Sequence, residues 1–172
     1  MSNRMLVQGK FKPKNPNKYK GDSSNIIYRS SWELTVFRYL DSNPAIIQWA
    51  SEEFFVPYRH PLTNKISRYF PDVYLKYRNS ANTITETVWE VKPKKQTQPP
   101  RIPKRKTKSW KYSAEQYVIN DAKWKACKKY CDKRGYNFQL ITEDRIPLNS
   151  LHNPEANVGN IRYPLFSIRF VL

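Results

Sequence analysis

The fold is decided by two stretches, Phe70-Pro71-Asp72-Val73-Tyr74-Leu75 and Val88-Trp89-Glu90-Val91-Lys92. Both are rich in β-branched and aromatic residues and are expected to lie in strands. Eighteen positions separate Asp72 from Glu90, enough for one strand, a turn and most of a return strand. If the pair is antiparallel, the two carboxylates converge at one end. Lys92 lies two residues after Glu90 and therefore points to the same face of its strand.

Two carboxylates and a lysine at one point are suited to phosphodiester cleavage. Mg²⁺ keeps several waters and typically uses one or two protein carboxylates together with substrate phosphate. Such an ion activates water and stabilises a leaving oxygen. Lys92 can then orient or deprotonate the attacking water, or neutralise charge that grows on the phosphate. The alternative is structural: Asp72 caps a strand, and Glu90 and Lys92 form only a surface ion pair.

The flanking segments predict two helices and further strands. A helix is expected to begin after Ser30, because Ser30 and Glu33 are spaced as a capping box, and to end at 41–44. A long helix is expected over 113–133, where apolar residues recur at helical spacing before Gly135. Strands are expected at 54–58, 68–77, 83–91 and 137–142, with a further possible strand at 166–171. Turns are expected at 61–65 and 79–82, and a short apolar link at 46–49. The order is helix, three-stranded meander, helix, strand.

The net charge of +17 points to a polyanionic partner, and it is unevenly placed. Residues 1–28 carry a net +5 and should form an extended basic arm. Residues 92–111 carry nine Lys/Arg and no acid, while residues 29–91 are balanced. The prolines of 92–111 forbid a regular helix, so this segment is expected to be a loop beside the carboxylates. If the two basic segments neutralise about eight phosphates, log K against log salt should slope near −7.

Several side chains are candidates for contact with DNA. They are Arg29, Lys94, Lys95, Arg101, Lys104, Arg105, Lys106, Lys108, Trp110 and Lys123. For Lys123 a solvated helix face is the favoured alternative. Trp124 and Tyr112 are expected to pack in the core rather than stack on bases. Glu52 or Glu53, just before an expected strand, is a weaker candidate for the metal site.

Other function classes find no support in the sequence. Cys127 and Cys131 lie four apart in the long helical pattern and are expected to be small apolar core residues in a reducing compartment. His60 and His152 do not complete a zinc pattern with them. No apolar run approaches the roughly 18 residues of a membrane span, and no secretory signal is visible. An intracellular or virion-associated protein, without membrane contact, is therefore expected.

Pro71-Asp72 and Glu90-Val91-Lys92 resemble the two defining elements of the PD-(D/E)XK nuclease superfamily. The order of expected elements also resembles its αβββαβ core, which implies an α/β fold with a mixed sheet flanked by helices. The resemblance implies a DNA endonuclease dependent on Mg²⁺ or Mn²⁺. Asp72 and Glu90 would be metal ligands, Lys92 the catalytic lysine, and Glu33 an auxiliary metal ligand. A capping-box role for Glu33 is compatible with that assignment.

Four motifs extend the resemblance over about residues 25–145. They are Tyr28-Arg29-Ser30-Ser31-Trp32-Glu33, Tyr69-Phe70-Pro71-Asp72, Trp89-Glu90-Val91-Lys92-Pro93 and Tyr136-Asn137-Phe138-Gln139-Leu140-Ile141-Thr142-Glu143. Together they resemble the head completion nucleases of T-even-like tailed phages and, more distantly, the TnsA endonucleases. This implies a role in capsid maturation or DNA packaging, with DNA, capsid or portal proteins and a second copy as possible partners.

Two other functions remain open at this stage. One is a non-catalytic DNA-binding capsid or connector protein, and the other is a structure-specific endonuclease of the transposon or repair type. In domain terms, the chain is expected to consist of a basic arm (1–28), a nuclease core (29–145) and a C-terminal extension (146–172) whose role is open.

Overall fold

A four-stranded mixed sheet forms the centre of the computed structural model, which describes residues 8–145. Its strands are, in spatial order, β3 (Ile46–Ala50), β6 (Val73–Arg78), β7 (Ile84–Val91) and β8 (Asn137–Ile141). The first three pair antiparallel, whereas β7 and β8 pair parallel. A parallel pair needs a long crossover, and here η2 (Lys94–Gln96), a basic loop and α2 (Lys108–Asp132) supply it.

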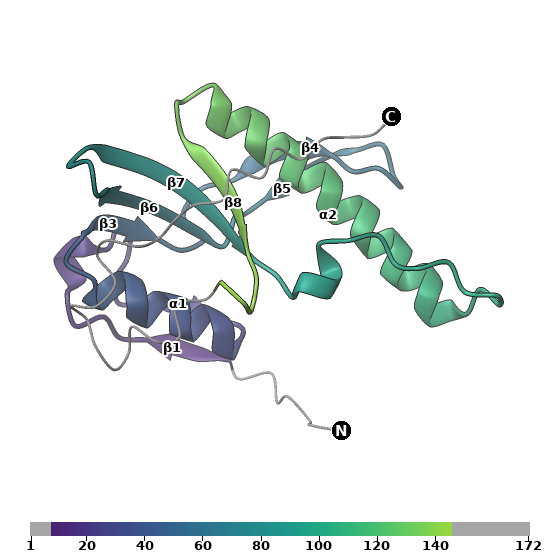
Figure 1. The fold of residues 1–172 in the computed structure, drawn as a ribbon, viewed down its shortest axis with the longest axis horizontal. Coiled ribbons are helices and arrows are strands. Elements are labelled where there is room, and N and C mark those ends of the chain that lie inside the picture. Colours follow the sequence, from purple (N-terminus) through teal and green to yellow (C-terminus); the bar gives the residue numbers. More distant parts are fainter. Residues whose placement is uncertain (1–7, 146–172) are drawn as a thin grey trace.

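The two helices cover opposite faces of this sheet (Figure 1). Successive strand residues point to opposite faces, so the odd-numbered and even-numbered residues of β6 and β7 lie on different faces of the sheet. Helix α1 (Ser31–Ser42) packs with odd positions such as Val73 and Leu75, while α2 packs with even positions such as Tyr74 and Val88. The result is the expected α/β fold, a mixed sheet between helices as in restriction-endonuclease-like nucleases.

A separate hairpin lies beside α2. It consists of β4 (Val56–Arg59) and β5 (Ile66–Tyr69), which pair antiparallel with Val56 opposite Tyr69. The turn predicted at 61–65 closes it, as expected. Its buried side chains, among them Tyr58 and Tyr69, join the core cluster on the α2 face of the sheet. The hairpin is thus held by α2 rather than by the edge of the main sheet.

The predicted three-stranded meander is therefore wrong in one respect. The stretch 68–77 is not one strand, because it breaks at Phe70-Pro71-Asp72 into β5 and β6, which belong to different sheets. Proline has no N–H to donate to a ladder, and Pro71 is buried at this break. The place of the first meander strand is taken by β3, in residues expected to be only a link.

The N-terminal segment also differs from its expectation. Residues 9–28 pack on the body of the protein instead of extending from it, with β1 (Gly9–Phe11) paired to β2 (Ile26–Tyr28) and a single turn, η1 (Pro16–Lys18), between them. The backbone N–H groups of Lys14 and Asn15 donate to the buried Asp41 carboxylate at 2.8 and 3.0 Å. The aromatic rings in the segment pack against Trp49, which a count of charges does not reveal.

Helix α2 begins five residues earlier than expected. The side chain of Thr107 caps it by accepting from the Trp110 N–H, so residues 108–111 of the expected loop are helical. Gly135, with φ of +71°, follows its end as predicted. Trp124, Cys127 and Cys131 are buried, which confirms their core assignment, but Tyr112 is 63% exposed and its expected core packing is wrong.

The possible strand at 166–171 and the extension 146–172 lie outside the described residues. Within residues 8–145, no helix is both long and apolar enough to cross a membrane.

Candidate active site

Asp72 and Glu90 meet where β6 begins and β7 ends. Val73 pairs with Trp89, so the next position outward places Asp72 opposite Glu90. Both are even-numbered and share the face that α2 covers. The Val91 N–H donates to the Asp72 carboxylate at 2.7 Å, which fixes that side chain across the pair of strands. The convergence expected from the eighteen-residue spacing is present.

Lys92 completes the group from the same strand end. Its Nζ lies 2.9 Å from Glu90 Oε1, and Glu90 is only 3% exposed, so this ion pair is not a surface pair. Burial acts to lower the pKa of Lys92, but the charges of Glu90 and Asp72 outweigh it and raise that pKa, which keeps the ammonium protonated. The backbone N–H of Lys92 donates to the Ile141 carbonyl at 2.9 Å, so β8 holds this residue in place.

The two carboxylates lie close enough together that the charge of one disfavours ionisation of the other. Burial and the neighbouring Glu90 charge raise the pKa of Asp72 well above its ordinary value. Both carboxylates offer hard oxygen donors, which is the ligand type that Mg²⁺ and Mn²⁺ prefer. The side chains of Asp72 and Glu90 therefore fit a divalent cation.

Tyr69 is a member of the site that the sequence did not single out. Its hydroxyl donates to Glu90 Oε2, while Lys92 binds the other oxygen. Burial and the Glu90 charge raise the pKa of Tyr69, so the phenol keeps its proton and remains a donor. The only available signal was its position directly before Phe70-Pro71-Asp72. Nothing local showed that the hairpin would fold over the end of β7.

Lys123 approaches the same point from α2. Its ammonium lies 5.7 Å from the ring centroid of Tyr69 and 5.9 Å from that of Tyr58. Burial lowers the pKa of Lys123, although the negative charges of Glu90 and Asp72 offset part of this effect. The favoured expectation of a solvated helix face is wrong for Lys123, because this side chain is half-buried and its ammonium lies beside the rings of Tyr58 and Tyr69.

Glu33 forms the predicted capping box at the start of α1. Ser30 Oγ accepts from the Glu33 N–H at 3.1 Å, and the Glu33 carboxylate accepts from Ser30 Oγ at 2.8 Å and the Arg29 N–H at 2.9 Å. The Glu33 charge also acts on Asp72 and Lys92. Within residues 8–145, however, no three Asp, Glu, His or Cys side chains surround a common point. The ligand role of Glu33 therefore stays a prediction.

The other acidic candidates have different partners. Glu52, whose φ is +55°, forms an ion pair with the Arg29 guanidinium. The Glu53 carboxylate accepts from the Tyr19 hydroxyl at 2.9 Å. Neither contact joins Glu52 or Glu53 to the Asp72–Glu90 pair. Arg29, one of the expected phosphate contacts, has its guanidinium beside Glu52, and the charge of Asp72 also reaches it.

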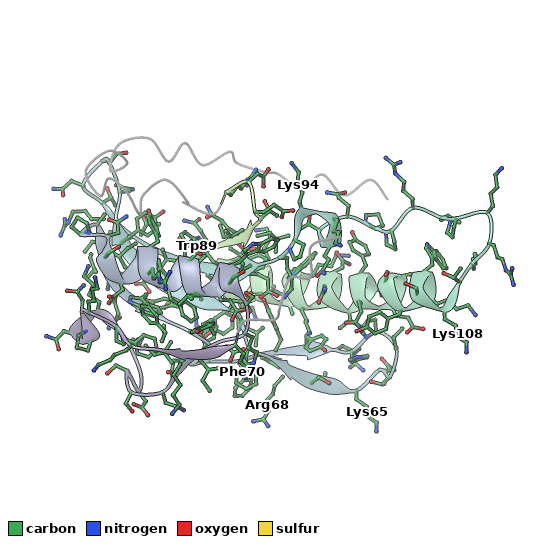
Figure 2. The ribbon with its side chains drawn as sticks, turned by 90° about the horizontal axis from the view of Figure 1, so that it is seen from below. Lys65, Arg68, Phe70, Trp89, Lys94 and Lys108 are labelled. Carbon is green, nitrogen blue, oxygen red and sulfur yellow. The ribbon has the colours of Figure 1, made fainter. Side chains whose placement is uncertain are left out.

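The basic loop leaves the site at Lys92 and returns along α2. Figure 2 shows Lys94 near its start and Lys108 at the far end of α2. The Lys94 side chain pairs with Asp144 at 3.0 Å, and the Trp110 indole N–H donates to the Arg101 carbonyl at 2.9 Å, which fastens the loop to α2. The remaining cations are exposed on the loop or at the helix start, namely Lys95, Arg101, Lys104, Arg105, Lys106 and Lys108. DNA contact by these residues remains a prediction.

This geometry agrees with two comparisons with known proteins. The model of the TnsA-like endonuclease N-terminal domain matches residues 43–143. The chain belongs to the TnsA-like endonuclease family. The matched region of this TnsA-like endonuclease runs from the residues before β3 to just after β8, and it contains Asp72, Glu90, Lys92 and Lys123. It begins after α1, so Glu33 lies outside it.

A phage protein matches more of the chain than the domain model does. The head completion nuclease of Enterobacteria phage T4 is 42% identical over 144 residues, which is 81% of this chain and 93% of the relative. The similarity therefore includes nearly the whole phage protein rather than a shared module. The domain family and the phage protein are both described as nucleases. Both matches cover the end of the sheet where the carboxylates lie.

Proposed function

We propose that this TnsA-like endonuclease cleaves DNA with a divalent metal ion, Mg²⁺ or Mn²⁺, held by Asp72 and Glu90. The observation that carries the proposal is the convergence of these two carboxylates with two lysines, Lys92 and Lys123, at one sheet end. A bound divalent ion would supply Lewis-acid stabilisation of the phosphate and a water of lowered pKa.

The protein groups have separable roles in this proposal. Lys92, kept protonated by its carboxylate neighbours, offers a positive charge to the scissile phosphate as negative charge grows in the transition state. Lys123 approaches from α2 and adds a second positive charge. Tyr69 occupies one oxygen of Glu90, so the orientation of that carboxylate is set before a metal or substrate arrives.

The biological setting is proposed from the phage relative. A protein named for head completion, 42% identical over 93% of its own length, supports a role for this chain in completing phage heads, on DNA associated with the capsid. A structure-specific endonuclease of the transposon type is the second candidate, favoured by the TnsA-like domain match. A non-catalytic capsid protein has less support, because such a protein has no need for a buried carboxylate, Glu90, paired with a half-buried one, Asp72, beside two lysines.

The deciding experiment is cleavage of supercoiled plasmid by purified protein. Wild type should nick or linearise the plasmid with Mg²⁺ or Mn²⁺ and lose activity in EDTA. Folded Asp72→Ala and Glu90→Ala proteins should be inactive, and Asp121→Ala, a half-buried carboxylate paired with Lys125 on α2, should retain activity. Equal cleavage by wild type and the two site variants would overturn the proposal. A panel of linear, circular, branched and single-stranded DNAs then separates the two candidate settings.

A further inference from the structure

The β4–β5 hairpin has an outward face that no part of residues 8–145 covers. Its inward side chains, Val56, Tyr58 and Tyr69, are buried. The alternate positions point outward, and they place Pro57 opposite Arg68 and Arg59 opposite Ile66. Ile66 is 66% exposed and Phe55 is 47% exposed. This face lies outside the proposed site.

The charge of the hairpin is entirely positive. Between residues 54 and 71 there are three cations, Arg59, Lys65 and Arg68, and no acid. Within the described residues 8–145, none of the three forms an ion pair with a carboxylate. The acids that precede the hairpin, Glu52 and Glu53, are engaged by Arg29 and Tyr19. Asp72, which follows the hairpin, belongs to the proposed site, where its carboxylate accepts from the Val91 N–H. The hairpin therefore presents an unbalanced positive surface.

The outward face also carries aromatic rings beside its cations. The Phe55 and Phe70 rings lie 5.9 Å apart, and the Arg68 guanidinium lies 5.6 Å from the Phe55 centroid. Phe70, 42% exposed, comes two residues before Asp72. In Figure 2 Lys65 and Arg68 point away from α2, which lies between the hairpin and the basic loop. Exposed aromatic groups with adjacent arginine are suited to contact with nucleic acid, because rings pack on bases and sugars while arginine binds phosphate.

From these observations we infer that the outward face of the β4–β5 hairpin is a second DNA-binding surface. It holds the part of the substrate that leaves the site on the side opposite to the basic loop. The two positive elements then flank α2 and the carboxylates, so DNA is held on both sides of the phosphate to be cut. This inference rests on the proposed function, since it concerns the same substrate.

The test compares two matched double variants in DNA binding. Phe55→Ala/Arg68→Gln removes one exposed aromatic and one arginine from the hairpin. The control, Ile84→Ala/Arg78→Gln, removes an exposed apolar residue and its cross-strand arginine partner at the far end of β6. Arg78 lies six residues from Asp72, about 20 Å along the strand. Both proteins are first shown to be folded by circular dichroism and thermal melting.

Affinity for a fluorescent DNA duplex is measured by anisotropy in EDTA over a range of salt. The hairpin variant should bind roughly ten-fold more weakly, with a log K against log salt slope reduced in magnitude by about 0.9 for the lost phosphate contact. The control should bind as wild type. Equal affinity of the hairpin variant and wild type, or equal weakening of both variants, would overturn the inference. Plasmid cleavage by wild type tests the proposed function separately. If wild type cleaves DNA but the hairpin variant binds DNA equally well, only the inference about the hairpin is contradicted.

Discussion

The Tyr69 hydroxyl donates a hydrogen bond to the Glu90 carboxylate, and the two residues come from different sheets. The hairpin and the main sheet are therefore joined at the proposed metal ligand itself. A ligating carboxylate oriented by an outer hydrogen bond binds metal more tightly than a free one, and loss of such a partner typically costs 10–100-fold in affinity or activity.

Tyr69→Phe removes this hydrogen bond and keeps the ring. We expect the variant to fold, to need roughly ten-fold more Mg²⁺ for half-maximal cleavage, and to show a smaller loss at saturating metal. The measurement is plasmid cleavage over a Mg²⁺ titration. Tyr58→Phe is the matched control, since Tyr58 also packs beside Lys123 on the hairpin. If the two variants require the same Mg²⁺ concentration, Tyr69 does not position Glu90.

Asp72→Asn should stabilise the metal-free protein while it abolishes cleavage. The raised pKa of Asp72 means that its ionised form is unfavourable in the folded state. The contribution of this carboxyl to stability is fully present below its unfolded pKa of about 3.9 and is lost as pH rises through the raised folded pKa. The melting temperature of Asp72→Asn minus that of wild type should therefore grow from about pH 4 upward, by roughly 2–4 °C per kcal/mol.

Divalent metal should reverse the order of the melting temperatures of wild type and Asp72→Asn. Mg²⁺ or Mn²⁺ stabilises a protein that binds it in the folded state, so wild type should gain melting temperature with metal and Asp72→Asn should gain little. Asp132→Asn, an exposed carboxylate paired with Lys128, serves as the control and should behave as wild type in both comparisons. A melting difference that is flat with pH would contradict the assigned charge state of Asp72.

Lys123→Met tests the second lysine. The substitution keeps an unbranched apolar chain against Tyr58 and Tyr69 and removes only the charge. Loss of a charged contact to phosphate typically costs about 1.5–3 kcal/mol, so kcat/KM should fall by roughly 10–100-fold. Lys128→Met, an exposed site on the same helix, is the control. Equal kcat/KM for the two variants would show that Lys123 acts only in packing.

The basic loop and the N-terminal segment should differ in their effect on DNA binding. The triple change Lys104→Gln/Arg105→Gln/Lys106→Gln should reduce the magnitude of the salt slope by about 2.7, at about 0.9 per phosphate. The triple change Lys10→Gln/Lys12→Gln/Lys14→Gln should change it little, because that segment packs with α1 on the opposite face of the sheet from the carboxylates. Anisotropy titrations at several salt concentrations measure both slopes, and equal losses would show that charge alone governs binding.

Local sequence signals predicted the parts of the fold that depend on neighbouring residues. The capping box of Ser30 and Glu33 and the turn at 79–82 arise within a few residues, and both are present. The convergence of Asp72 and Glu90 was also predictable, because one turn joins their strands and period-two alternation sets their face.

Features that depend on contacts between distant elements were not predictable in this way. The role of β3 requires knowledge of its partner β6, and the short stretch at 46–49 gives no such information by itself. Lys123 was expected to be solvated, because the sequence of α2 alone does not show that the β4–β5 hairpin packs against this part of the helix. Tyr69 looked like an ordinary strand residue, since its partner Glu90 is twenty-one residues away and in another sheet.

The hydrogen bond from the Lys92 N–H to the Ile141 carbonyl has a consequence for synthesis of the protein. β8 is the last described strand, and its parallel pairing with β7 forms only after the whole crossover has been made. A nascent chain on the ribosome thus carries Asp72, Glu90 and Lys92 long before it has the strand that holds Lys92 in place. The order of translation itself delays the complete Asp72–Glu90–Lys92 arrangement until β8 has been made.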